Sequence, residues 1–156
     1  MAKTDYCKCR YKHCRHGDEP LLKTDAVKEG NLYYHKDCYK TRENIKQIIK
    51  VYTEKVDGNP IYAYLNRVIN DVIFKQNTDS NFLLFAIKKA TEPGSSWKVR
   101  NPQGIPYLAK DEKLKKLWLD KERASKPKIR FEVLENTVAP SGYVPEKEKR
   151  IGDLFD

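Results

Sequence analysis

Long hydrophobic runs are missing from this 156-residue chain. The longest uninterrupted apolar stretch runs from Phe82 to Ile87, far short of the roughly 18 residues that cross a bilayer. The opening MAKTDYCKCR also lacks the apolar segment of a secretory signal. We therefore expect a cytoplasmic protein with no membrane partner.

Catalytic motifs are missing as well. No phosphate-cradling glycine loop, paired carboxylate motif or Ser/His/Asp set is found at a recognisable spacing. Glu19 and Glu29 lie near histidines, but neither has the His-Glu-x-x-His context of a catalytic base. The sequence therefore predicts a protein that is not an enzyme.

Acidic residues are fewer than basic ones. The chain has 22 Asp and Glu against 31 Lys and Arg, which gives a formal net charge of +9. Such a balance suits a protein that meets polyanions or acidic partners. Basicity alone does not choose between them.

Cysteine and histidine are scarce, yet all four cysteines and all three histidines lie within residues 6–40. In a reducing cytosol, clustered thiols are more often metal ligands than disulfides. Three cysteines come first, and the pair His35 and Cys38 follows in the spacing His-x2-Cys. Zinc commonly takes four such ligands from two tight turns.

The intervening AVKEGNLYY predicts a hairpin whose turn uses the φ > 0 tolerance of Gly30 and Asn31. This order of cysteines, hairpin, His-x2-Cys and helix resembles treble-clef and half-LIM zinc modules over residues 7–45. It departs from them in the first pair, which in those modules is Cys-x2-Cys.

We predict a structural Zn²⁺ site, because four protein ligands leave no open position for catalysis. The predicted ligands are Cys9, Cys14, His35 and Cys38. Cys7 competes with Cys9 for the first position, and His13 and His16 are weaker substitutes.

Beyond residue 43 the apolar residues recur with a helical period. A first helix is expected to run to Val56 and a second to start at Pro60, capped by Asn59 and mostly buried. A third follows a cap at Asp79 or Ser80, and a fourth, after the turn at residues 101–106, carries Leu114, Leu117 and Trp118 on one face.

The fourth helix also carries a basic face that could track phosphates. Its predicted nucleic-acid-binding residues are Lys110, Lys113, Lys116, Lys121 and Arg123. Neighbouring acidic residues such as Asp120 and Glu122 would instead make it an ordinary solvated helix.

The carboxy-terminal IGDLFD resembles the short peptides with which bacterial replication and repair proteins bind the sliding clamp. The resemblance rests on Asp153, Leu154 and Phe155, whereas Ile151 stands where those peptides have glutamine. It implies a docking segment on a free linker. The alternative is that Leu154 and Phe155 fold back on the core.

The chain is thus expected to be α+β and mainly α. Its expected parts are a zinc module at residues 1–42, a helical bundle at 43–126, a strand segment packed on it at 127–139, and a flexible tail at 140–156. The expected function is a non-catalytic accessory protein that binds nucleic acid or replication machinery. The alternative is an adaptor or inhibitor, such as a phage or mobile-element protein that acts on a host factor.

Overall fold

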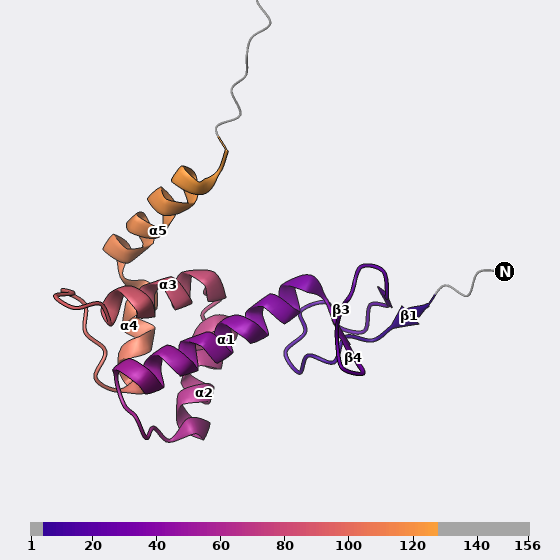
Figure 1. The fold of residues 1–156 in the computed structure, drawn as a ribbon, viewed down its shortest axis with the longest axis horizontal. Helices are drawn as coiled ribbons and strands as arrows, with labels where there is room; N and C mark the ends of the chain where they lie inside the picture. The colour runs from indigo at the N-terminus through magenta and orange to yellow at the C-terminus, as the bar shows by residue number, and fades with distance from the viewer. Residues whose placement is uncertain (1–4, 128–156) are drawn as a thin grey trace, which may run out of the picture. The chain divides into compact units, whose positions relative to one another are not determined.

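A computed structural model describes residues 5–127 (Figure 1). The strands are β1 Tyr6–Cys7, β2 Leu21–Leu22, β3 Val27–Glu29 and β4 Leu32–Tyr34. The helices are α1 Lys36–Lys55, α2 Tyr62–Asn70, the π-helical turn η1 Asp71–Lys75, α3 Ser80–Ala90, the 3-10 turn η2 Pro102–Gly104, α4 Ile105–Lys110 and α5 Glu112–Ser125. The mainly helical character is confirmed. The predicted strand around residues 129–133 and the tail from residue 140 lie outside the described residues.

Two small antiparallel hairpins make up the amino-terminal module. β3 pairs with β4 in the register Glu29 to Leu32, so that only Gly30 and Asn31 form the loop. Gly30 has a φ of 59°, a conformation that costs glycine little, whereas Asn31 stays outside the left-handed region. The expected hairpin is present, and glycine alone supplies its special backbone angle.

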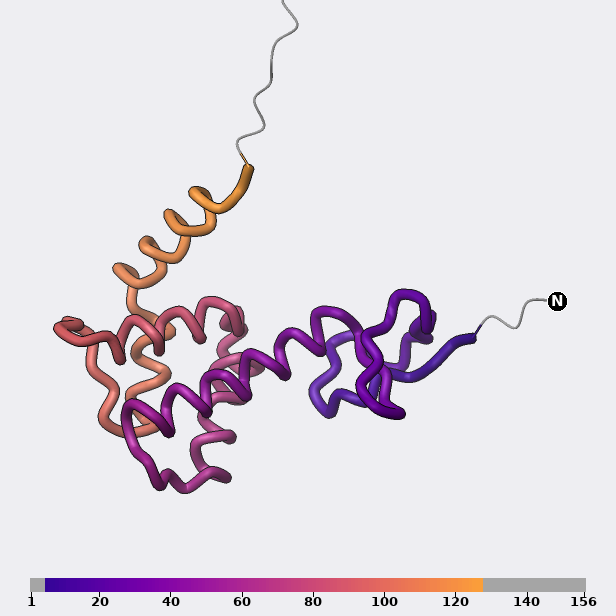
Figure 2. Tube along the Cα trace, in the orientation of Figure 1, coloured from indigo at the N-terminus to yellow at the C-terminus, as the bar shows by residue number. Residues whose placement is uncertain are grey.

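The first long helix begins earlier than its apolar pattern indicated. α1 starts at Lys36 instead of residue 43, because the apolar stripe marks only its core-facing part while its first turn belongs to the module. The expected boundary at residue 42 therefore falls inside a continuous helix (Figure 2). Both parts lie in one compact unit that extends to Ala124.

The main core forms where α1 packs against α3, with α2 and α4 closing it. Its fully buried side chains include Ile48, Tyr52, Leu65 and Leu83. Buried Asn44 makes two polar contacts across the α1–α3 interface, where it donates to Ser80 Oγ and to Asn81 Oδ1, both at 2.9 Å. Within residues 5–127, no helix is both long and apolar enough to cross a membrane.

The second helix is less buried than expected, and it starts later. α2 begins at Tyr62 with Ile61 as its N-cap, so Pro60 precedes the helix instead of opening it. Leu65 is fully buried, but Ile61 is 75% exposed and Tyr64 is 39% exposed. A helix on a core surface buries one stripe only, and these two side chains lie outside it.

The expected fourth helix is divided. Asp111 adopts an extended conformation between α4 and α5, and its carboxylate accepts a hydrogen bond from Leu114 N at 2.9 Å, which caps α5. Leu114 is fully buried and Trp118 packs against the core, as predicted. Leu117 is instead 43% exposed.

The contrast within α2 gives a test of this packing. Leu65→Ala should lower the free energy of unfolding by about 2–5 kcal/mol, because it empties a fully buried site. Ile61→Ala should change it by less than about 0.5 kcal/mol. Chemical denaturation followed by circular dichroism measures both values, and similar losses in the two variants would contradict the structure.

Candidate metal centre

The module places Cys9 beside the second hairpin. Residue Cys9 forms an isolated bridge with Tyr33 of β4, and Arg10 N donates to the Tyr33 carbonyl oxygen at 3.0 Å. Cys14 follows in a tight turn closed by Cys14 N and the Tyr11 carbonyl oxygen at 3.1 Å. These backbone bonds bring the first two thiols to the end of β4.

The other two ligands come from the start of α1. His35 is the N-cap residue, and its side chain makes no capping hydrogen bond. Cys38 lies in the first turn at position N3, next to the N-cap on the same side of the helix. The His-x2-Cys spacing therefore aims both side chains at one point.

The donor atoms of Cys14, His35 and Cys38 lie close to the separations that a tetrahedral metal requires, and that of Cys9 lies within 4.8 Å of each of them. Cys9, Cys14, His35 and Cys38 offer ligand atoms that all lie within 4.8 Å of one another. The Sγ atoms of Cys38 and Cys14 are 3.7 Å apart, and His35 Nδ1 lies 3.4 Å from Cys14 Sγ and 3.9 Å from Cys38 Sγ. Around a zinc ion the corresponding edges are about 3.8 Å for two sulfurs and about 3.6 Å for sulfur and nitrogen. The four residues could therefore hold one metal ion.

Burial makes a cation necessary for thiolates at this place. Cys9 and Cys38 are buried, and all four cysteines are free of disulfides. Burial raises the pKa of the Cys38 thiol to about 12, with further contributions from Cys14 and Cys9. A divalent ion among the sulfurs would supply the positive charge that favours the thiolate form.

The alternative ligands have other contacts. Cys7 Sγ donates to the Leu21 carbonyl oxygen at 3.2 Å and is not part of the cluster. The His13 ring stacks on Phe74 with the ring centroids 4.7 Å apart. Of the two first-position candidates, the geometry brings Cys9 to the site.

His16 lies beside the cluster in a supporting position. Its Nε2 lies 2.7 Å from a carboxylate oxygen of Asp37, and its ring centroid is 4.1 Å from that of His35. His16, Asp37 and Cys38 form a second, overlapping group of possible ligands. The Asp37 carboxylate thus contacts His16, whose ring lies against that of the ligand candidate His35.

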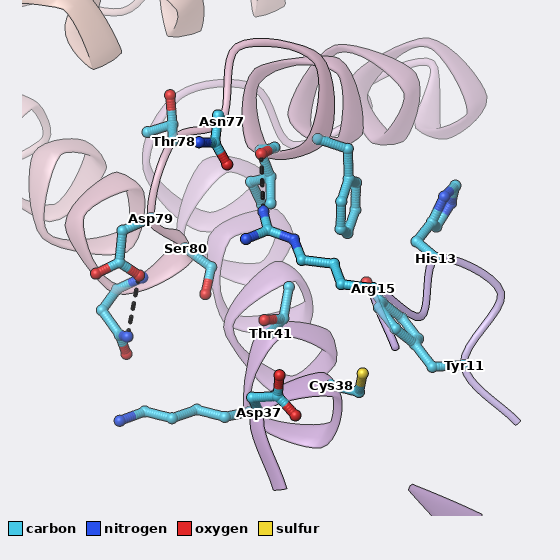
Figure 3. Close-up of a pocket in the computed structure, with 14 residues that line it drawn as sticks. Tyr11, His13, Arg15, Asp37, Cys38, Thr41, Asn77, Thr78, Asp79 and Ser80 are labelled. Atoms are coloured by element: carbon cyan, nitrogen blue, oxygen red, sulfur yellow. Dashed lines mark hydrogen bonds between the residues drawn. The ribbon is translucent and has the colours of Figure 1, made fainter. Parts of the chain in front are cut away.

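No sequence pattern indicated the contact between the module and η1. Arg15 Nη2 donates to the Ile73 carbonyl oxygen at 3.3 Å, and the Arg15 guanidinium lies 5.5 Å from the Phe74 ring centroid. Around this contact lies a hollow of about 300 Å³ whose lining includes Tyr11, Cys38 and Thr41 (Figure 3). Arg15 directly follows the ligand Cys14, so one loop serves both the cluster and this contact.

The predicted basic residues do not share one face. Lys110 ends α4, while the other four lie on α5. Lys121 Nζ lies 5.1 Å from the Phe85 ring centroid and 5.9 Å from that of Trp118. Arg123 lies 4.0 Å from an Asp120 oxygen. Lys113 and Lys116 are exposed.

The predicted docking residues Asp153, Leu154 and Phe155 lie outside the described residues.

No protein-family model, curated protein or solved structure matches this chain. The resemblance to treble-clef and half-LIM modules therefore depends only on the order of the ligands and the position of the hairpin. The assignment of the metal centre depends on the donor geometry.

Three serine variants test the ligand assignment. Cys38→Ser should reduce bound metal from one ion per chain to nearly none and lower the free energy of unfolding by at least about 2 kcal/mol, because the module loses its cross-link. Elemental mass spectrometry and thermal unfolding measure the two effects.

Cys7→Ser is the matched control, since a serine hydroxyl can still donate to the Leu21 carbonyl oxygen. It should keep the metal. Loss of metal from Cys7→Ser with retention in Cys9→Ser would reverse the assignment.

Proposed function

We propose that this chain is a non-catalytic zinc protein that acts as an accessory factor on nucleic acid. The zinc assignment depends on one observation, the cluster of three cysteines and one histidine. Four protein donors fill a tetrahedral zinc and leave no position for substrate or activated water. Asp37 lies beside the cluster and pairs with His16.

In this proposal the metal ion is structural and stabilises the amino-terminal module. The buried residues of the module are Cys9, Leu21, Tyr34 and Cys38, so two of the four are ligands. Such a small apolar core cannot offset the entropy of ordering a segment of this length. A bound metal supplies the missing stabilisation, as in other small modules that need a staple.

Zinc fits this donor set better than the other common divalent ions. Thiolate and imidazole ligands are softer than the oxygens that Mg²⁺ and Ca²⁺ prefer. Tetrahedral sites of sulfur and nitrogen are typical of zinc.

The nucleic-acid part is supported by charge. An excess of nine basic residues favours polyanions, and each lysine or arginine that meets a phosphate adds salt-sensitive affinity. Replication proteins are included among the proposed partners because of the resemblance of the last residues to clamp-binding peptides. The competing function, an adaptor or inhibitor, predicts a single protein partner instead.

The decisive experiment is to purify the full chain at moderate salt, measure its metal, and identify what accompanies it with and without nuclease. We expect one zinc per chain and nucleic acid or a replication protein. Fluorescence anisotropy with labelled oligonucleotides should then give a linear fall of log affinity with log salt.

Three results would contradict the proposal. Protein that folds fully without metal would remove its structural part. One zinc per chain with a single partner unrelated to nucleic acid would favour the adaptor or inhibitor. An affinity for oligonucleotides no greater than that for heparin would mean that the binding is non-specific attraction to polyanions.

A further inference from the structure

α2 and α4 meet in a surface that has cations and no carboxylates of its own. Between residues 5 and 127, the two longest stretches without Asp or Glu are residues 58–70 and 93–110. The first contains α2 and the second contains η2 and α4, and these elements pack against one another. The fold therefore joins the two acid-free stretches, which are far apart in the sequence.

Two tyrosines line a hollow on this surface. The hollow of about 430 Å³ is lined by Tyr64, Val68, Gln103, Pro106, Tyr107 and Lys110. Tyr107 is 77% exposed and Tyr64 is 39% exposed. Tyr107 buries little of its surface within the chain, and Tyr64 keeps more than a third of its surface exposed, so both rings are accessible to a ligand.

Each tyrosine has a cation one helical turn further on. Arg67 follows Tyr64 by three residues on α2, and Lys110 follows Tyr107 by three residues on α4. Residues three apart are neighbours on a helix surface. Arg67 and Lys110 are exposed, and neither is within ion-pair distance of a carboxylate of residues 5–127. Both helices thus present an aromatic ring and an unpaired cation together.

The basic residues of α5 lack this combination. Glu112 and Asp120 line the same hollow as Lys116 and Arg123. The ammonium of Lys121 already lies against the rings of Phe85 and Trp118. A phosphate chain would meet mixed charge on α5, but only positive charge from α2 and α4.

We propose that the α2–α4 surface binds single-stranded nucleic acid, with bases stacked on Tyr64 and Tyr107 and phosphates near Arg67 and Lys110. Unpaired bases expose their faces for stacking, whereas bases in a duplex do not. Stacking tolerates any base, so the surface takes strands with little sequence preference. This inference rests on the proposed nucleic-acid function. In it, the strand contacts mainly α2 and α4 and not the basic residues of α5.

The test compares four variants of the full chain with the native chain by fluorescence anisotropy. The probes are labelled oligothymidylate, oligouridylate and a DNA duplex of equal length. Tyr64→Ala with Tyr107→Ala should weaken single-strand binding by at least about tenfold, because two stacking platforms are lost. Tyr64→Phe with Tyr107→Phe should bind as the native chain does, since the rings remain.

Tyr62→Ala is the matched control. Tyr62 also lies on α2 and is 54% exposed, but it does not line the hollow. Its removal should change the affinity less than twofold. A preference for oligothymidylate or for oligouridylate would identify DNA or RNA as the natural strand, and the loss of binding in the double alanine variant supports the surface in either case.

The outcomes separate this inference from the function on which it rests. If the native chain binds strands, and the double alanine variant binds equally well while Lys113→Glu with Lys116→Glu does not, nucleic-acid binding stands and the α2–α4 surface is wrong. Tighter binding of the duplex would also overturn it. If the native chain binds polyglutamate but no oligonucleotide, both proposals fail.

Discussion

The first turn of α1 is the constraint on which the rest of the structure depends. It supplies His35 and Cys38 to the candidate metal centre, and the same helix continues into the main core through Ile48 and Tyr52. Because a helix is stiff over this length, ligands at one end are fixed relative to buried residues at the other. The candidate metal centre is therefore connected to the main core by a continuous helix.

A second connection passes through the loop that contains Cys14. Arg15 reaches the Ile73 carbonyl oxygen, and His13 stacks on Phe74, so that the loop contacts η1 from two positions. η1 is a π-helical turn, in which the backbone hydrogen bonds differ from those of an α-helix. Its Ile73 carbonyl oxygen accepts a hydrogen bond from the Arg15 side chain. Metal binding at Cys14 would fix this loop and with it the contact to the helical region.

The basic residues of the chain serve different tasks in different places. On α5 they are mixed with carboxylates or lie against aromatic rings, which favours solubility and packing. α2 and α4 have fewer cations than α5, but these cations lie beside exposed tyrosines. The segments that contain α2 and α4 have no acidic residue. The proposed α2–α4 surface therefore differs from α5 in offering accessible rings beside its cations and no carboxylate within the two segments.

The sequence by itself determined the local features: the His-x2-Cys pair, the Gly30 turn, the third helix with a cap at Asp79 or Ser80, and the mainly helical fold. Each follows from residues close together in the chain, where spacing and periodicity act directly. Only the tertiary structure decided that Cys9 and not Cys7 joins the cluster, that Ile61 faces outward, and that residues 58–70 meet residues 93–110. These outcomes depend on which surfaces pack together, and contacts between distant segments leave no periodic signal in the sequence.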